Sequence, residues 1–185
     1  DDLLLVIDEF NFYAAEAFAH EESYYTQSVE ESIKQAGHNP FGQRGVDYSA
    51  GFRVYDISKP DAPRQIGQFS IEGLGIHRLW YVGGRYAYAS ALLDGYTDHI
   101  FMVVDMSDPT RPQEAGRWHL PGQWSAGGEQ PTWAKGDRVA LHHAIVANNI
   151  AYGSWRDGGL TLIDVSDAAH PKLLAHRNWH PPFGG

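Results

Sequence analysis

Three short stretches of the chain share one pattern of apolar and polar positions. Each has two apolar residues, an aspartate, an apolar residue and a serine, and a proline follows seven residues after the aspartate. The aspartates are Asp56, Asp105 and Asp164. Because an apolar run that ends in turn-forming residues is typical of a buried strand, each stretch predicts a strand and then a turn capped by the aspartate side chain. Their recurrence every 50 to 60 residues, roughly, indicates an internal repeat.

A second pair of matching stretches precedes the last two of these strands. Residues 86–90 and 150–154 follow a Gly-Gly and an Asn-Asn turn signal, which predicts β-hairpins. One repeat then contains strands ending near Val82 and at 86–90, 100–106 and 113–118, and the next contains strands at 143–146, 150–154, 160–165 and 172–176. Four short antiparallel strands in about 40 to 50 residues are typical of a propeller blade, so the predicted fold is an all-β propeller fragment.

The strand Leu160-Thr161-Leu162-Ile163-Asp164 resembles the motif that gives the LVIVD-repeat β-propellers their name, and the resemblance covers residues 51–180. Known members are bacterial and archaeal proteins of several blades, mostly without an assigned activity. We expect one propeller segment over residues 1–185, made of a truncated blade at 1–69, a blade at about 74–118 and a blade at about 139–177. A complete ring needs about twice this length, so the chain is expected to join a larger ring, or else to assemble from several copies.

An insertion at about 9–49 interrupts the strand pattern of the first blade. Apolar residues at Val29, Ile33 and Ala36 follow helical spacing and Gly37 ends the run, so the insertion is predicted to be partly helical. Long insertions between strands often serve as lids or interaction surfaces.

Composition and charge exclude several classes of function. The chain has 185 residues, of which 43% are apolar, and no cysteine, which excludes disulfides and thiolate metal sites. The longest apolar run, Leu3 to Ile7, is too short for a membrane helix, so we expect a soluble protein of unknown location. The net charge is −9, yet nine acidic residues fall in residues 1–31, and no basic face favours nucleic acid or a membrane surface.

Histidines recur at one place in the repeat. His77 and the pair His142-His143 lie where the innermost strand of a blade begins, although aligning Tyr88 with Tyr152 leaves them one residue out of register. A β-bulge at Gly73 or Gly75 would restore the match. Inner strands line the channel of a propeller, so these imidazoles would converge near its axis, where Zn, Fe, Mn or Cu could bind. His180 could contribute a further ligand. The arrangement is similar to that of carotenoid-cleavage oxygenases and the selenium-binding protein or methanethiol oxidase group.

Two alternatives to metal binding stay open for these histidines. The imidazoles could bond to backbone groups inside a narrow polar channel, or they could act directly in acid–base chemistry.

The loops between the second and third strands should reach the same rim of the propeller. They carry Asp94 and Asp157, and Glu9 has the comparable place in the first blade. These carboxylates could orient ligands or act as a general base, and Arg156 could hold an anionic substrate, although Asp-Gly pairs also simply shape turns. Trp155 and Tyr96 could bind substrate, and the aromatic residues of this rim could equally form a small satellite core.

No phosphate-binding glycine loop and no Gly-x-Ser-x-Gly elbow occurs in the sequence, so a nucleotide cofactor and serine-hydrolase chemistry are not expected. The sequence thus predicts a metal-dependent enzyme that acts on a small organic molecule by oxidation, hydrolysis or lyase chemistry. The alternative is a non-catalytic scaffold or protein-binding module, because fold alone favours neither.

Overall fold

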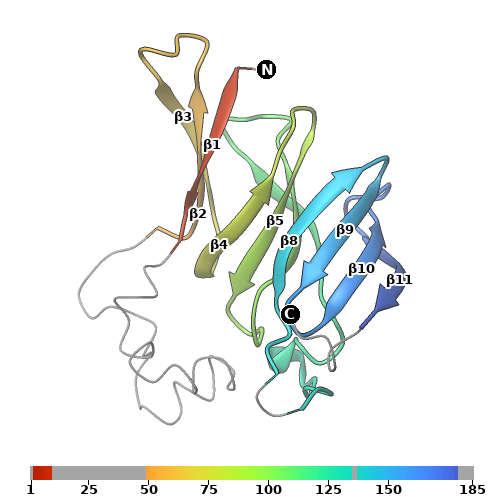
Figure 1. The fold of residues 1–185 in the computed structure, drawn as a ribbon. Helices are drawn as coiled ribbons and strands as arrows, with labels where there is room; N and C mark the ends of the chain where they lie inside the picture. Colours follow the sequence, from red (N-terminus) through yellow and green to blue (C-terminus); the bar gives the residue numbers. More distant parts are fainter. Residues whose placement is uncertain (1, 10–48, 135–136, 179–185) are drawn as a thin grey trace, which may run out of the picture.

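A computed structural model describes residues 2–9, 49–134 and 137–178, and within these residues the chain forms three antiparallel β-sheets. The first sheet has the order β1-β2-β3, the second β4-β5-β6-β7 and the third β8-β9-β10-β11. Figure 1 shows the three sheets side by side in chain order. This all-β arrangement is that of a β-propeller fragment, as the repeat predicts.

The strands of the first sheet are β1 (Leu3–Asp8), β2 (Gly51–Asp56) and β3 (Arg64–Ser70). Those of the second are β4 (Gly73–Trp80), β5 (Tyr86–Leu93), β6 (Ile100–Asp105) and β7 (Gln113–Trp118), and those of the third are β8 (Leu141–Ala147), β9 (Ile150–Trp155), β10 (Gly159–Asp164) and β11 (Lys172–Arg177). The four strands expected in each of the two later blades are therefore confirmed. The predicted helical insertion lies outside the described residues.

The repeated aspartates cap the turns after β2, β6 and β10. The Oδ1 atoms of Asp56, Asp105 and Asp164 each accept a hydrogen bond from the backbone N–H of the serine two residues later, at 2.9, 2.8 and 2.8 Å. The side chain thus replaces a backbone acceptor in the turn, which confirms its structural role. Within the described residues, no helix is long and apolar enough to cross a membrane.

Two hydrophobic layers join the sheets face to face. The first lies between the first two sheets, where Phe52 and Val54 pack with Ile76 and Met102, and all four are 0% exposed. The second lies between the later two sheets, where Phe101 and Val103 pack with Ala151 and Ile163. Alternate residues of β6 therefore enter opposite layers, which explains why this strand is apolar on both faces.

Glycines on the outermost strands allow each sheet to approach the next. A Cβ atom on Gly67 of β3 would lie 2.2 Å from the backbone oxygen of Pro109, and one on Gly116 of β7 would lie 2.3 Å from that of Ala168. Gly67 pairs with Val54, Gly116 with Val103 and Ala175 with Leu162, so the three positions are equivalent in the repeat. The turn of the following blade is thus in contact with the backbone of the preceding one.

Candidate functional site

Two inner strands carry a histidine at the same structural position. Ile76 pairs with Ala91 and Arg78 with Ser90, so the register shift leaves His77 of β4 as the extra residue of a bulge. On β8, Leu141 pairs with Trp155 and His143 with Ser154, and His142 is the extra residue. A further register shift lies between Gly73 and Gly75, where a bulge was predicted. Because both strands bulge at the histidine, the bulges make His77 equivalent to His142 but do not cause the offset of one residue seen in the sequence. The connection from Trp80 to its partner Tyr88 contains one residue more than that from Ile145 to Tyr152, so the offset lies in the β4–β5 hairpin and not at the bulge expected near Gly73 or Gly75.

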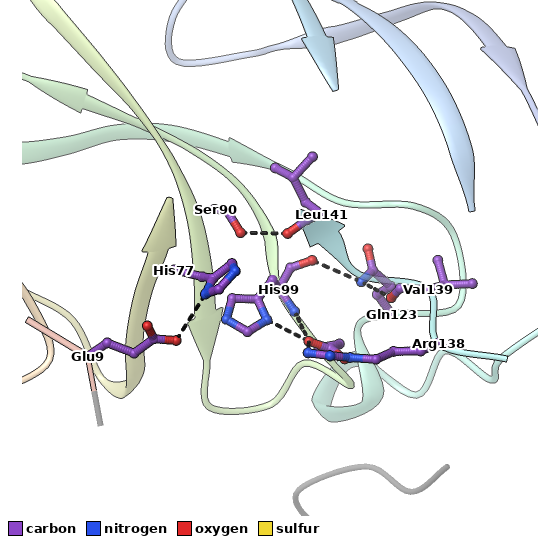
Figure 2. A network of polar contacts seen from close by, with 9 residues as sticks. Glu9, His77, Ser90, His99, Gln123, Arg138, Val139 and Leu141 are labelled. Carbon is purple, nitrogen blue, oxygen red and sulfur yellow. Dashed lines mark hydrogen bonds and ion pairs between the residues drawn. The ribbon is translucent and has the colours of Figure 1, made fainter. Parts of the chain in front are cut away.

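Three imidazoles lie together at this end of the sheets. The ring centroid of His77 is 5.3 Å from that of His142 and 5.5 Å from that of His99. His99 precedes β6 and is only 3% exposed. Figure 2 shows the rings of His77 and His99 side by side. The three histidines, which we call the histidine cluster, therefore come from β4, β8 and the loop before β6.

Carboxylates hold two of these rings. The Nδ1 atom of His99 is 2.6 Å from Asp98 Oδ1, and the guanidinium of Arg138 donates to both oxygens of Asp98, at 2.6 and 3.3 Å. The Nδ1 atom of His77 is 3.4 Å from Glu9 Oε1, and a backbone bridge between Glu9 and Gly75 keeps that glutamate beside β4. Figure 2 shows the contact of His77 with Glu9 as a dashed line, together with the contacts of His99 and Arg138 to the carboxylate between them. Because a carboxylate can only accept a hydrogen bond, the short contact with Asp98 favours the tautomer of neutral His99 that has its proton on Nδ1 and its lone pair on Nε2.

The local electrostatics favour a charged Asp98 and neutral imidazoles on β8. Burial raises the pKa of the Asp98 carboxyl, but Arg138 and His99 lower it by more, so that this pKa lies well below its usual range. Burial lowers the pKa of His142 and of His143, and the nearby His77 and Arg78 lower both further. Neutral imidazole is the form that binds a metal ion or accepts a proton.

The fold and its repeat agree with a known family. The family model of the LVIVD repeat matches residues 81–119 and 145–177, which cover most of the second and third blades. The chain belongs to the LVIVD-repeat family. No curated protein matches the chain. His77 and His142 lie outside the two matched segments, whereas His99 lies within the first. The repeat motif concerns the strands of a blade, so the chemistry of the histidine cluster must be argued from its own residues.

The histidine cluster has donors that suit a divalent transition metal, since imidazole nitrogen and carboxylate oxygen are common ligands of Zn²⁺ and Fe²⁺. The positions of the nitrogens are less suited: within residues 2–9, 49–134 and 137–178, no three or more His, Asp or Glu side chains are placed to hold one ion. The ring separations are nevertheless short. Binding to a shared ion would therefore require rotation of the side chains rather than movement of the strands.

The other two predicted ligands do not share the ring contacts of the histidine cluster. His143 packs edge-on against Trp80, with ring centroids 6.2 Å apart, and its Nε2 atom is buried without a hydrogen-bond partner in the described part of the chain. His180 lies outside the described residues.

The predicted carboxylates take two different positions in the LVIVD blades. Asp157 Oδ2 accepts a hydrogen bond from the backbone N–H of Arg138, at 2.6 Å, so this carboxylate joins two loops. Asp94 is exposed and lies with Glu72 and Ser70 in the lining of an open, polar hollow of about 550 Å³ between the first two blades. Of these two aspartates, Asp157 is linked to the histidine cluster indirectly, through Arg138 and then Asp98.

The predicted substrate-binding aromatics lie in the interior. Trp155 is 2% exposed, and its indole N–H donates to Thr161 Oγ1 at 2.8 Å. Tyr96 is 7% exposed and packs against the ring of His119, with centroids 5.3 Å apart. Arg156 is exposed at the rim, next to Trp155, and its backbone N–H donates to the carbonyl of Ala140.

Sequence reasoning missed His99, Asp98 and Arg138. The adjacent Asp98 and His99 stand directly before the predicted strand 100–106, in the same loop as Asp94, so position in the repeat was the available signal. No comparable signal marks Arg138, which reaches Asp98 from the linker before β8.

Proposed function

We propose that the histidine cluster of His77, His99 and His142 is the centre of a metal-dependent enzyme that acts on a small organic molecule at this end of the LVIVD blades. The observation that carries the proposal is the pairing of His99 with Asp98 and of His77 with Glu9 beside a third imidazole. Ligating histidines in metalloproteins usually donate their second ring nitrogen to a carboxylate or carbonyl, which fixes the tautomer and the ring orientation.

Two further features support a metal such as Zn, Fe, Mn or Cu. The equivalent bulged positions of His77 and His142 repeat one side chain from blade to blade at the inner strands, as a shared site requires. The lowered pKa of His142 favours the neutral ligand form near pH 7. A metal ion held here would polarise a substrate or activate a bound water, which suits oxidation, hydrolysis or lyase chemistry.

Two of the predicted rim residues keep their roles as part of this proposal. Asp94 is available at the rim as a basic or orienting carboxylate, and Arg156 is available to hold an anionic group of the substrate. His143 and His180 remain proposed additional ligands, as do ligands from the rest of a propeller ring or from further copies.

The test is metal analysis of the full chain by inductively coupled plasma mass spectrometry after purification without chelator. We expect near-stoichiometric metal in the wild type and at least a tenfold loss in the triple variant His77→Ala/His99→Ala/His142→Ala. The matched control is His170→Ala, because His170 is exposed and pairs only with Asp167 among its described contacts. Circular dichroism establishes that each variant is folded.

A scaffold function is the second candidate, and one observation favours it. Ile145 and Tyr152 are neighbours on the outer face of the third blade and remain 47% and 41% exposed. Apolar surface on a sheet face suits a protein partner. A folded wild type without metal, even after incubation with zinc, iron, manganese or copper salts, would contradict the enzyme and leave the scaffold as the function.

A further inference from the structure

A series of hydrogen bonds connects the third blade to the His99 ring. Asp157, in the turn between β9 and β10, accepts the backbone N–H of Arg138 at 2.6 Å. The guanidinium of Arg138 donates through Nε to Asp98 Oδ2 at 2.6 Å, and Asp98 Oδ1 is 2.6 Å from His99 Nδ1. Arg138 and Asp98 are 14% and 13% exposed, so water screens their ion pair only weakly.

The backbone of His99 is fixed from the same side. Its carbonyl oxygen accepts the N–H of Leu141, at 3.0 Å, and the side-chain amide of Gln123, at 3.3 Å. Gln123 is 0% exposed and also donates to the carbonyl of Val139, at 3.0 Å. With the main chain held in this way, the side-chain torsions of His99 decide where its ring points, and the contact with Asp98 restrains those torsions.

We propose that Asp157 and Arg138 are positioning residues that hold the His99 ring and its tautomer through Asp98. The inference rests on the proposed function, since His99 is one of the proposed ligands, and it gives Asp157 a role other than that of a general base. A carboxylate only accepts hydrogen bonds, so Asp98 holds the imidazole proton on Nδ1 and leaves the lone pair on Nε2. Asp157 acts indirectly, because it orders the backbone that carries the Arg138 side chain.

The experiment is ¹⁵N–¹H NMR of the histidine rings in metal-free, chelator-treated full chain, which reports the tautomer of each ring directly. His99→Gln identifies the His99 signals. The variants are Asp157→Ala, which removes the acceptor, Asp157→Asn, which keeps an oxygen for the Arg138 N–H, and Arg138→Gln, which removes the ion pair. Asp61→Asn is the matched control, because Asp61 is an exposed aspartate in the turn between β2 and β3 and belongs neither to this series nor to the proposed site.

We expect the wild type to show His99 with its proton on Nδ1. Arg138→Gln should give a clear population of the Nε2-protonated tautomer and Asp157→Ala a smaller one. Asp157→Asn and Asp61→Asn should give the wild-type His99 signals. Zinc affinity, measured by competition with a chromogenic chelator, should fall by about 10- to 100-fold in Arg138→Gln and by less in Asp157→Ala. This order of the variants distinguishes a positioning role from a general loss of stability, because a general loss of stability would not change the tautomer of His99 alone.

The inference is wrong if folded Asp157→Ala and Arg138→Gln both keep the wild-type His99 tautomer. If Arg138→Gln does not fold, the His99 tautomer in Asp157→Ala is compared with that in Asp157→Asn, and an unchanged tautomer in Asp157→Ala contradicts the inference. The proposed function fails in a different way, namely when the wild type binds no metal. The NMR result is independent of that outcome because it is measured without metal.

Discussion

A single methyl group at Gly116 should weaken the contact between the second and third blades. In Gly116→Ala the new Cβ atom would lie 2.3 Å from the carbonyl oxygen of Ala168 and 2.9 Å from that of Ala169. Both neighbours are backbone atoms and cannot move aside as a flexible side chain would. The turn after β10 must therefore shift by about 1 Å away from β7, which loosens the apolar layer beneath it.

The magnitude follows from two opposing effects. Overpacking of a tight contact costs about 1 to 3 kcal/mol, whereas replacing glycine stabilises by about 0.4 to 1 kcal/mol through the entropy of the unfolded chain. The free energy of unfolding should thus fall by about 1 to 2 kcal/mol. For a chain of this size, that loss lowers Tm by about 2 to 8 °C.

Urea unfolding followed by circular dichroism measures the effect, and the repeat supplies the control. Ala175 has the equivalent position on β11 and is exposed, so Ala175→Gly should cost less than about 1 kcal/mol. A Gly116→Ala variant as stable as the wild type, or more stable, would refute the proposed close contact.

Two further predictions concern single interactions. Arg85 donates to the Asp105 carboxylate and lowers the pKa of that carboxyl to about 2. Asp105→Asn should therefore lower the free energy of unfolding at pH 7. The loss should be about 1 kcal/mol or less, because the Arg85 side chain is 61% exposed and water screens the ion pair. A depressed pKa stabilises the folded state above the unfolded value near 4 and loses that effect as the pH falls through 2, so urea titrations of variant and wild type should converge below about pH 2. Trp155→Phe removes the indole donor to buried Thr161, so thermal unfolding should show a loss of about 1 to 3 kcal/mol, and an unchanged Tm would contradict the buried hydrogen bond.

The positions of the strands follow from the sequence because their cause is local. The hairpins are predicted by alternating apolar residues and by the Asn148-Asn149 turn. The turns after the strands are predicted by the repeated aspartates, each two residues before a serine. The structure confirms both. Both asparagines have positive φ, of 51° and 60°, which a tight hairpin of this type requires. Such preferences act over two to eight residues or so, and a single repeat unit already contains them.

The site follows from the sequence only in part. The repeat placed His77 and the pair His142-His143 at comparable positions, one residue out of register. The structure assigns the extra residue to the β4–β5 hairpin, which makes His77 equivalent to His142. By contrast, the predicted substrate-binding Trp155 lies in the core, because the sequence shows an aromatic residue near a loop but not which face of the strand it leaves.

The sequence by itself determined the blades, their order and the histidines on the inner strands, since each depends on contacts between residues close in the chain. Only the tertiary structure decided that Arg138 reaches Asp98 across 40 residues and that His99 joins the cluster. Such contacts depend on how one blade packs against the next, and the same packing requires glycine at Gly67 and Gly116. No local pattern encodes how closely two neighbouring sheets approach, because that separation is set only when two complete sheets pack together.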